Sequence, residues 1–228
     1  MRVEHPILGP VKVGSDEVVL VVSDLHLNHN KEFLWGKRSK LIPDERKAMH
    51  VIGVESYTNF ILNELREAYN MYSRISSNIY LLSLGDTCFN DANSEIAKRF
   101  IELPFTHIFM LGGNHTSGIK QLVLDNKLPD NVTLLAENIP LQISKGFYVN
   151  LSHYPPADFA TGMFGALCGH CHGALSELNA GNSELGRIFD CGVENALKLK
   201  GTVYFTLEEC LSYLREKQPI NRELRYDS

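Results

Sequence analysis

Short apolar runs rich in β-branched residues alternate along this chain with longer segments of helical periodicity, and no other feature constrains the fold as much. The runs cover residues 18–23, 78–84, 107–111, 132–135, 147–151 and 165–168. Strands that are buried on both faces read as continuous apolar runs, so these segments predict strands inside a sheet. The alternation therefore predicts an α/β fold in which helices cover the sheets.

Two helices are predicted by pattern. Between the first two runs, apolar residues recur at steps of three and four, which places them on one face of a long helix. These residues are Val54, Tyr57, Ile61, Leu65, Ala68, Tyr72 and Ile75. Near the C-terminus, Thr206 and Glu209 have the spacing of a capping box ahead of a second apolar stripe. This helix should end before Pro219, and the polar residues 219–228 should form a frayed tail.

Length and composition limit the class of protein. The chain has 228 residues, 44% hydrophobic and 21% charged, and it shows no internal repeat or linker, so we expect one domain over residues 1–228. Its 22 basic and 27 acidic residues give a net charge of −5, which is not the balance of a protein that coats nucleic acid. The apolar runs fall short of the ~20 residues of a membrane span, and no secretory signal pattern is present. Five cysteines, an odd number, favour reduced thiols in a cytoplasmic protein.

Residues that bind metals follow most of the predicted strands. Open α/β sheets bind ligands outside the carboxyl ends of their strands, so these residues point to one site. In chain order they are Asp24 and His26, Asp86 after Gly85, Asn114 and His115 after Gly113, His153, and His170 and His172. The two glycines permit the tight turns and close backbone approach that clustering of ions demands. One such block can occur by chance, but five at successive strand ends are not independent accidents.

The ligand types indicate a pair of transition-metal ions. Residues two apart on a strand point to the same side, so Asp24 and His26 can face one ion. His170 and His172 can do the same, or they can splay to two neighbouring ions. Carboxylates, imidazoles and an amide together suit Mn, Fe or Zn rather than calcium. A carboxylate shared by two ions about 3.5–4 Å apart would hold a bridging water and make it a nucleophile near neutral pH.

In this order, the blocks resemble the calcineurin-like metallophosphoesterase superfamily. They stand here as D-x-H at Asp24, GD at Gly85, GNH at Gly113, a lone His153 and GHxH at Gly169, and the resemblance spans about residues 17–210. The segments SDLHLNHN and LSHYP, and FDCGVEN followed by FTLEE, are similar to a small bacterial and phage branch. The resemblance implies a four-layer αββα sandwich, two mixed sheets flanked by helices, with a dinuclear site at one edge.

The resemblance also implies a role for each block. Two sets of three residues would each hold one divalent ion: Asp24, His26 and His172, and Asn114, His153 and His170. Asp86 would bridge the ions, and a bridging hydroxide would attack phosphorus in line. His115 would not bind metal but would contact the phosphate and help to protonate the leaving oxygen. Mn²⁺ is the expected metal, with Fe, Zn and mixed pairs as alternatives.

One departure from the pattern concerns the GNH block, which the family often follows with Asp or Glu and this chain follows with Thr116. The orientation of His115 and its efficiency as an acid therefore depend on what Thr116 does. His29, farther along the first loop, reads as a solvated residue, with contact to the substrate phosphate as the alternative.

Other residues fit competing patterns. Residues 168–172 also satisfy C-x-x-C-H, the attachment motif of c-type haem, and their cysteines could join a structural zinc site, but buried reduced thiols are the preferred interpretation. Residues 31–47 carry six basic and three acidic residues with Phe33 and Trp35 among them. We interpret them as a charged surface loop, with binding of nucleic acid as the alternative.

The predicted function is hydrolysis of a phosphomonoester or phosphodiester by a metal-dependent enzyme. Two alternatives are a non-catalytic metal-binding interaction module on the same fold and a metal-dependent nuclease. The complete ligand set with His115 argues against the first, and the second depends on the basic stretch alone. The blocks specify how a phosphoryl group is attacked and not what is attached to it, so small-molecule and nucleotide esters are both expected substrates.

Overall fold

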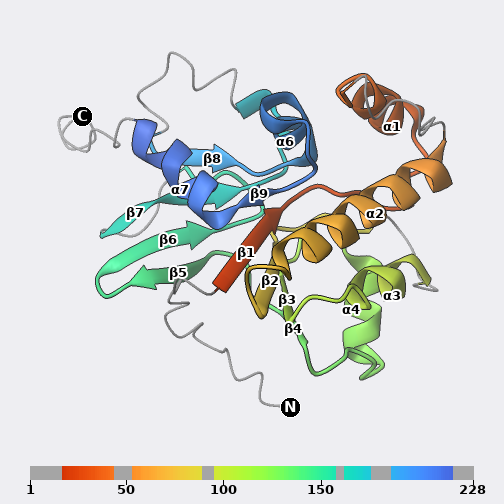
Figure 1. Cartoon of the computed structure of the whole chain (residues 1–228), viewed down its shortest axis with the longest axis horizontal. Coiled ribbons are helices and arrows are strands. Elements are labelled where there is room, and N and C mark those ends of the chain that lie inside the picture. Colours follow the sequence, from red (N-terminus) through yellow and green to blue (C-terminus); the bar gives the residue numbers. More distant parts are fainter. Residues whose placement is uncertain (1–16, 44–52, 89–94, 158–161, 176–185, 218–228) are drawn as a thin grey trace.

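The computed structural model describes residues 17–43, 53–88, 95–157, 162–175 and 186–217. Two mixed β-sheets and their accompanying helices make up this part of the chain, so the α/β class predicted from the sequence is confirmed (Figure 1). The predicted frayed tail at residues 219–228 and the last four residues of the basic stretch, residues 44–47, lie outside the described residues.

The first sheet has five strands in the order β4-β3-β2-β1-β9. They are β1 (Glu17–Val22), β2 (Asn78–Ser83), β3 (His107–Met110), β4 (Val132–Leu134) and β9 (Phe205–Thr206). β1 to β4 are parallel and correspond to four of the predicted runs, whereas β9 is antiparallel to β1. With two residues, β9 is too short to leave a strand pattern in the sequence.

The second sheet has four strands in the order β5-β6-β7-β8. They are β5 (Ile139–Ser144), β6 (Phe147–Leu151), β7 (Met163–Cys168) and β8 (Ile188–Asp190). β6, β7 and β8 are parallel, and β5 is antiparallel to β6. The sequence pattern predicts β6 and β7 but misses β5, an edge strand that contains Pro140, and β8, which has three residues.

The helices described are α1 (Glu32–Ser39), α2 (Val54–Tyr72), α3 (Glu95–Ile101), α4 (Ser117–Leu124), α6 (Val193–Lys200) and α7 (Leu207–Glu216). The predicted long helix is α2, and its stripe is buried from Tyr57 to Ala68. The prediction was wrong at its end, because the helix stops at Tyr72 and Ile75 beyond it is 75% exposed. In this part of the chain no helix is long and apolar enough to cross a membrane.

The two faces of the first sheet contribute to two different apolar cores. Alternate side chains of a strand point in opposite directions, so Leu20 and Val22 of β1 pack with α2, α3 and α4. Val19 and Val21 pack instead into a core between the two sheets, which α7 also enters. In Figure 1, α2, α3 and α4 accordingly lie on one side of the first sheet, away from β5 to β8.

The sheets are also joined by backbone at the end where β1 finishes. Ser23 and Gly192 form an isolated parallel bridge between the segments that follow β1 and β8. The Val193 N–H donates to the Ser23 carbonyl at 3.2 Å. This contact, together with the core between the sheets, fixes the carboxyl end of β1 beside that of β8.

The capping box of α7 gives a test of the fold. The Thr206 hydroxyl accepts from the Glu209 N–H at 3.2 Å, and the Glu209 carboxylate accepts from the Thr206 N–H at 2.7 Å, as predicted. We expect Thr206→Ala to lower the free energy of unfolding by about 1 kcal/mol, because it leaves an orphan N–H at the helix start. Urea denaturation followed by circular dichroism measures this.

Ser73→Ala is the control for the loss of a hydroxyl, because the exposed Ser73 hydroxyl bonds a carbonyl at the C-terminal end of α2. It should change stability by less than about 0.5 kcal/mol. Equal effects of the two substitutions would contradict a capping role for Thr206.

Candidate metal centre

Loops from both sheets meet at one edge and bring the predicted ligands together. Three groups have ligand atoms within 4.8 Å of one another: Asp24, His26 and His172; His26, Asp86 and His115; and Asp86, His153 and His170. The loops after β1, β2 and β3 supply four of these seven residues, and the loops after β6 and β7 supply the other three. His26 and Asp86 each belong to two groups, so the three groups form a continuous row.

The backbone of this edge differs from the expectation that paired ligands lie on a strand. β1 ends at Val22, and the loop residues Asp24 and His26 both have left-handed backbone, with φ of 56° and 46°. Asp86, His170 and His172 share this conformation. Each costs roughly 1–2 kcal/mol for a residue with a Cβ, and such strain is concentrated at functional sites.

Pairing with the neighbouring loop holds the first of these loops in place. The Asp24 N–H donates to the Gly85 carbonyl at 3.1 Å, and the His26 N–H donates to the Asp86 carbonyl at 2.9 Å. The parallel pairing of β1 with β2 is thus continued beyond the strand ends, and it fixes Asp24 and His26 relative to Asp86.

His26 is the most isolated polar side chain of the first group. It is buried, and neither ring nitrogen has a hydrogen-bond partner among the described residues. Burial, assisted by the positive charge of Arg38, lowers the pKa of His26 to about 2, so its imidazole is neutral at physiological pH. A buried neutral imidazole without a partner leaves a polar group uncompensated, and a metal ion would satisfy it.

Asp24 and His172 complete the first group. Burial raises the pKa of the Asp24 carboxyl to about 6, against the opposing charges of His172 and His153. Its carboxylate accepts the His170 N–H, at 2.8 Å to Oδ2. His172 Nδ1 lies 2.9 Å from Glu194 Oε1. Burial lowers the pKa of His172, but the hydrogen bond and charge of Glu194 outweigh this and raise it.

The other end of the row combines His153, His170 and Asn114. His153 Nδ1 lies 3.0 Å from the Leu84 carbonyl, to which it can only donate, so Nε2 carries the lone pair in the neutral ring. That Nε2 lies 3.4 Å from Asn114 Oδ1. His170 and His172 therefore belong to different groups, which is the splayed arrangement among the two that the sequence allowed.

Asp86 lies between the two sets. Its Oδ2 is 3.6 Å from His26 Nε2, and its Oδ1 is 3.5 Å from His153 Nε2. Burial alone would raise its pKa, but the hydrogen bond and charge of His153 outweigh this and lower the pKa to about 2. The carboxylate is therefore ionised at neutral pH and faces one set with each oxygen.

His115 and Thr116 hold the GNH turn in different ways. The His115 N–H donates to Asp86 Oδ1 at 2.8 Å, and its half-buried ring lies 5.1 Å from that of His26. The buried Thr116 hydroxyl donates to the Gly113 carbonyl at 2.9 Å. Thr116 thus closes the turn that carries His115, which is how it acts on the position of this histidine.

His29 is buried beside the clustered histidines. The interpretation of His29 as a solvated loop residue was therefore wrong. His29 is 5% exposed, and its Nδ1 accepts from the Lys31 N–H at 3.1 Å. Its ring centroid lies 5.4 Å from that of His26 and 6.0 Å from that of His115. The sequence placed it in the right loop, but its burial comes from packing that a local pattern does not record.

Sequence reasoning missed a buried network behind the first group. Arg38 of α1 is fully buried and donates from Nε to Glu194 Oε1 at 2.7 Å. Its two terminal nitrogens donate to the Asp24 carbonyl at 2.7 Å and to the Leu25 carbonyl at 3.1 Å, and also to the Tyr57 hydroxyl. The interpretation of residues 31–47 as a surface loop was therefore wrong for the helical residues 32–39. Nothing local marks Arg38 as buried, because its partner Glu194 lies 156 residues away in sequence.

The two cysteines of the C-x-x-C-H pattern differ in burial. Cys168 is fully buried in a small core on the outer face of the second sheet, with Ala166, Leu175 and Ile188. Cys171 is partly buried and unbridged, and burial raises the pKa of its thiol to about 11. Neither forms a disulfide, and only Cys168 is buried as the preferred interpretation expected.

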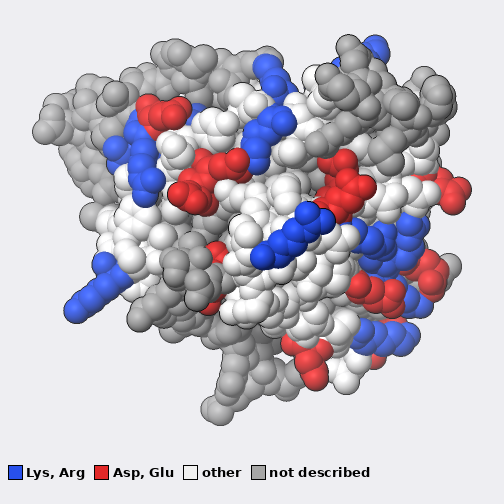
Figure 2. All heavy atoms as spheres, viewed as in Figure 1, with Lys and Arg blue, Asp and Glu red and all other residues white. Residues whose placement is uncertain are grey.

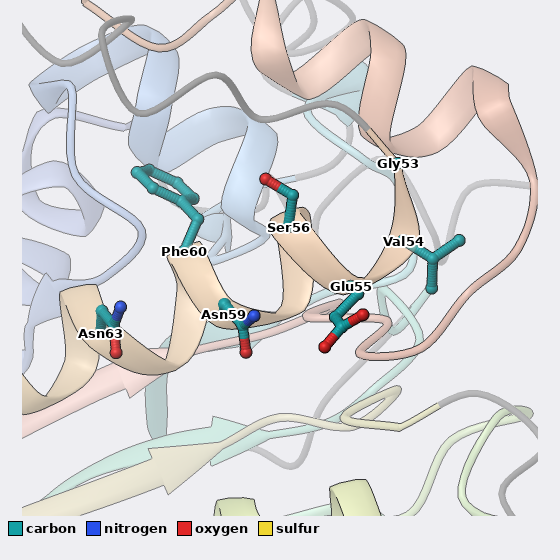
Figure 3. Close-up of a pocket in the computed structure, with 7 residues that line it drawn as sticks. All are labelled: Gly53, Val54, Glu55, Ser56, Asn59, Phe60 and Asn63. Atoms are coloured by element: carbon teal, nitrogen blue, oxygen red, sulfur yellow. The ribbon is translucent and has the colours of Figure 1, made fainter.

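A separate hollow lies at the start of α2, away from these groups. Figure 3 shows its lining residues: Gly53, Val54, Glu55, Ser56, Asn59, Phe60 and Asn63. None of the clustered histidines and carboxylates lines it. Asn59 accepts from Arg99 of α3 at 2.6 Å, so one of its polar side chains already has a structural partner.

Comparison with known proteins identifies a similar fold but no family. No protein-family model matches the chain, and no curated protein matches it. The fold is similar to that of AQ665 from Aquifex aeolicus, a protein of unknown function, with a TM-score of 0.54 and 17% sequence identity. The similarity covers 86% of this chain and 99% of that chain. At this identity the comparison speaks for the fold alone.

Substitution of Gly113 tests whether metal binding requires the present position of the Asp86 carboxylate. A Cβ on this residue would lie 2.2 Å from Asp86 Oδ1 and 2.8 Å from the Asp86 nitrogen, too close for any side chain. We expect Gly113→Ala to displace the carboxylate and abolish the binding of at least one metal ion, measured by metal analysis after dialysis against Mn²⁺.

Gly146→Ala is the matched control. Its Cβ would meet nothing within 4 Å, although φ is 78°. It should lower stability by about 1 kcal/mol through backbone strain and leave metal binding unchanged. Normal metal binding by Gly113→Ala would show that the position of Asp86 is not needed.

Proposed function

We propose that this chain is a dinuclear-metal phosphoesterase of the calcineurin-like superfamily, with two divalent transition-metal ions, Mn²⁺ foremost. The ions would be held by two sets of residues, Asp24, His26 and His172, and Asn114, His153 and His170, with Asp86 shared. The observation that carries the proposal is the placement of Asp86, whose two carboxylate oxygens face opposite sets at 3.6 and 3.5 Å.

The chemistry of the donor set supports this assignment. His26 is buried, neutral and without a hydrogen-bond partner among the described residues, and its Nε2 lies 4.0 Å from Asp24 Oδ1 and 3.6 Å from Asp86 Oδ2. Asp24 and Asp86 are both buried, and a buried carboxylate costs free energy unless a positive charge is paired with it. Mixed imidazole and carboxylate ligands suit Mn, Fe or Zn. When bound, two such ions supply Lewis acidity that activates water and neutralises phosphoryl oxygens.

The fold that accompanies this proposal is the four-layer αββα sandwich. One helical layer covers the first sheet. The two sheets, packed against the core between them, are the two middle layers. The outer face of the second sheet also carries an apolar cluster, with Ala166, Cys168 and Ile188 joined by Leu175 from beyond β7. An apolar outer face requires cover by a further layer, which supports the fourth.

His115 is the residue we assign to the leaving group. Its backbone is tied to Asp86 and its turn is closed by Thr116, so the half-buried ring is held beside the middle of the row of ligands. An imidazolium in that position would donate a proton to the departing oxygen and stabilise its charge. Asp86 and His115 are therefore the catalytic residues proposed.

The first experiment pairs metal content with turnover on one sample. About two transition-metal ions per chain are expected, with hydrolysis of bis-p-nitrophenyl phosphate or p-nitrophenyl phosphate that a chelator abolishes and Mn²⁺ restores. Asp86→Asn should lose metal and nearly all activity, because a neutral amide cannot bridge two cations. Asp125→Asn, which removes an exposed carboxylate beside Lys127, is the control. Full activity of Asp86→Asn would overturn the proposal.

The variant His115→Asn distinguishes between two roles for His115, that of a general acid and that of a metal ligand. His115 also shares a ligand-distance group with His26 and Asp86, so the geometry alone admits it as a metal ligand. We expect this variant to keep both ions and to lose about 10²–10⁴-fold in kcat, the usual contribution of a general acid. Loss of one ion would instead make His115 a ligand. Metal analysis and kinetics on the same preparation measure both.

The two alternative functions gain no specific support. A non-catalytic module would not need His115 beside a complete set of ligands. A nuclease would need a basic surface, but in the view of Figure 2 the described Lys and Arg side chains are interspersed with Asp and Glu. Arg38, part of the basic stretch that suggested it, is buried in an ion pair.

A further inference from the structure

We propose that the buried pair of Arg38 and Glu194 positions the first set of ligands and sets the affinity for the ion bound there. The inference rests on the proposed function, since it assigns these residues to one of its two ions. Arg38 comes from α1 and Glu194 from α6, and neither belongs to the ligand sets described above.

Glu194 fixes which nitrogen of His172 is available to a metal. Its Oε1 lies 2.9 Å from His172 Nδ1, closer than Arg38 Nη2 at 3.3 Å, and a carboxylate can only accept, so the nearer contact favours a proton on Nδ1 of a neutral His172. The lone pair is then on Nε2, on the opposite side of the ring. A carboxylate behind a metal-binding histidine orients the ring and makes it a stronger donor.

Arg38 acts on the other two residues of the set through the backbone. It donates to the carbonyl of Asp24 at 2.7 Å and to the carbonyl of Leu25, which precedes His26, at 3.1 Å. The Tyr57 hydroxyl donates to the same Leu25 carbonyl at 3.0 Å. Asp24 and His26 both have left-handed backbone, so these bonds help to hold the loop in a conformation that it would not favour alone.

One guanidinium therefore touches, directly or through one partner, every residue of the first set. Arg38 Nε donates to the same Glu194 oxygen that His172 approaches, at 2.7 Å. Two residues of the second set have supports of their own: His153 Nδ1 lies 3.0 Å from the Leu84 carbonyl, and Asn114 Oδ1 accepts from the Tyr154 hydroxyl at 3.4 Å. Only His170 is tied to the first set, because its N–H donates to Asp24 Oδ2 at 2.8 Å. The pair should accordingly affect the first ion more than the second.

The experiment measures Mn²⁺ binding by calorimetric titration of the full chain. His172→Ala and His153→Ala identify which of the two binding events belongs to each set. We expect Glu194→Gln to weaken the binding of the ion that His172→Ala removes by about 10–100-fold, and to weaken the binding of the other ion by much less.

A second variant distinguishes a specific loss of metal binding from a failure of Glu194→Gln to fold. Glu194→Gln leaves Arg38 buried without a charged partner, whereas the double variant Arg38→Met with Glu194→Gln removes both charges. It should fold and show the same selective loss of one ion. Glu209→Gln, which removes the charge from the Lys200–Glu209 pair outside the ligand sets, should leave both ions unchanged.

Three outcomes would overturn the inference while leaving the proposed function intact. They are normal affinity for both ions in Glu194→Gln, equal weakening of both ions, and failure of the double variant to fold, which would make the pair a requirement of the fold. Absence of Mn²⁺ binding by the unaltered chain would instead overturn the proposed function.

Discussion

The apolar core between the two sheets is the constraint on which the candidate site depends. Loops of the first sheet carry Asp24, His26 and Asp86, and loops of the second carry His153, His170 and His172. Neither sheet alone holds either proposed set. Val19 and Val21 on one side and residues such as Val149 and Leu167 on the other fix the relative position of the sheets, and the ligand distances follow from that packing.

The candidate site contains many buried polar groups, and burial of a polar group costs free energy unless it has a partner. Hydrogen bonds and ion pairs with the surrounding chain offset this cost for most of these groups. Asp86 has hydrogen bonds and charges from His153 and the His115 N–H, and Glu194 has Arg38 and His172. Among the described residues, both ring nitrogens of His26, the Ser23 hydroxyl and Glu194 Oε2 are buried without hydrogen-bond partners. Under the proposed function, a bound metal ion would satisfy the His26 imidazole.

Local sequence signals predicted which histidines and carboxylates lie together, because each signal depends on short-range chemistry. The blocks at Asp24, Gly85, Gly113 and Gly169 combine a ligand with a turn at a strand end, and parallel strands bring such ends to a common edge. The glycine at position 113 is required because Asp86 occupies the place of its Cβ, a close approach that the sequence anticipated. The same local rules were wrong where tertiary packing decides, as at Ile75 and His29.

The sequence by itself determined the strands with continuous apolar runs, the α2 stripe, the α7 capping box and the identity of the candidate ligands, because these are encoded by neighbours in the chain. The tertiary structure alone decided that His170 and His172 separate to different groups and that Arg38 is buried against Glu194. It also decided that the short strands β8 and β9 complete the sheets. These features depend on contacts between residues distant in sequence, whose free energy appears only when both sheets are packed together.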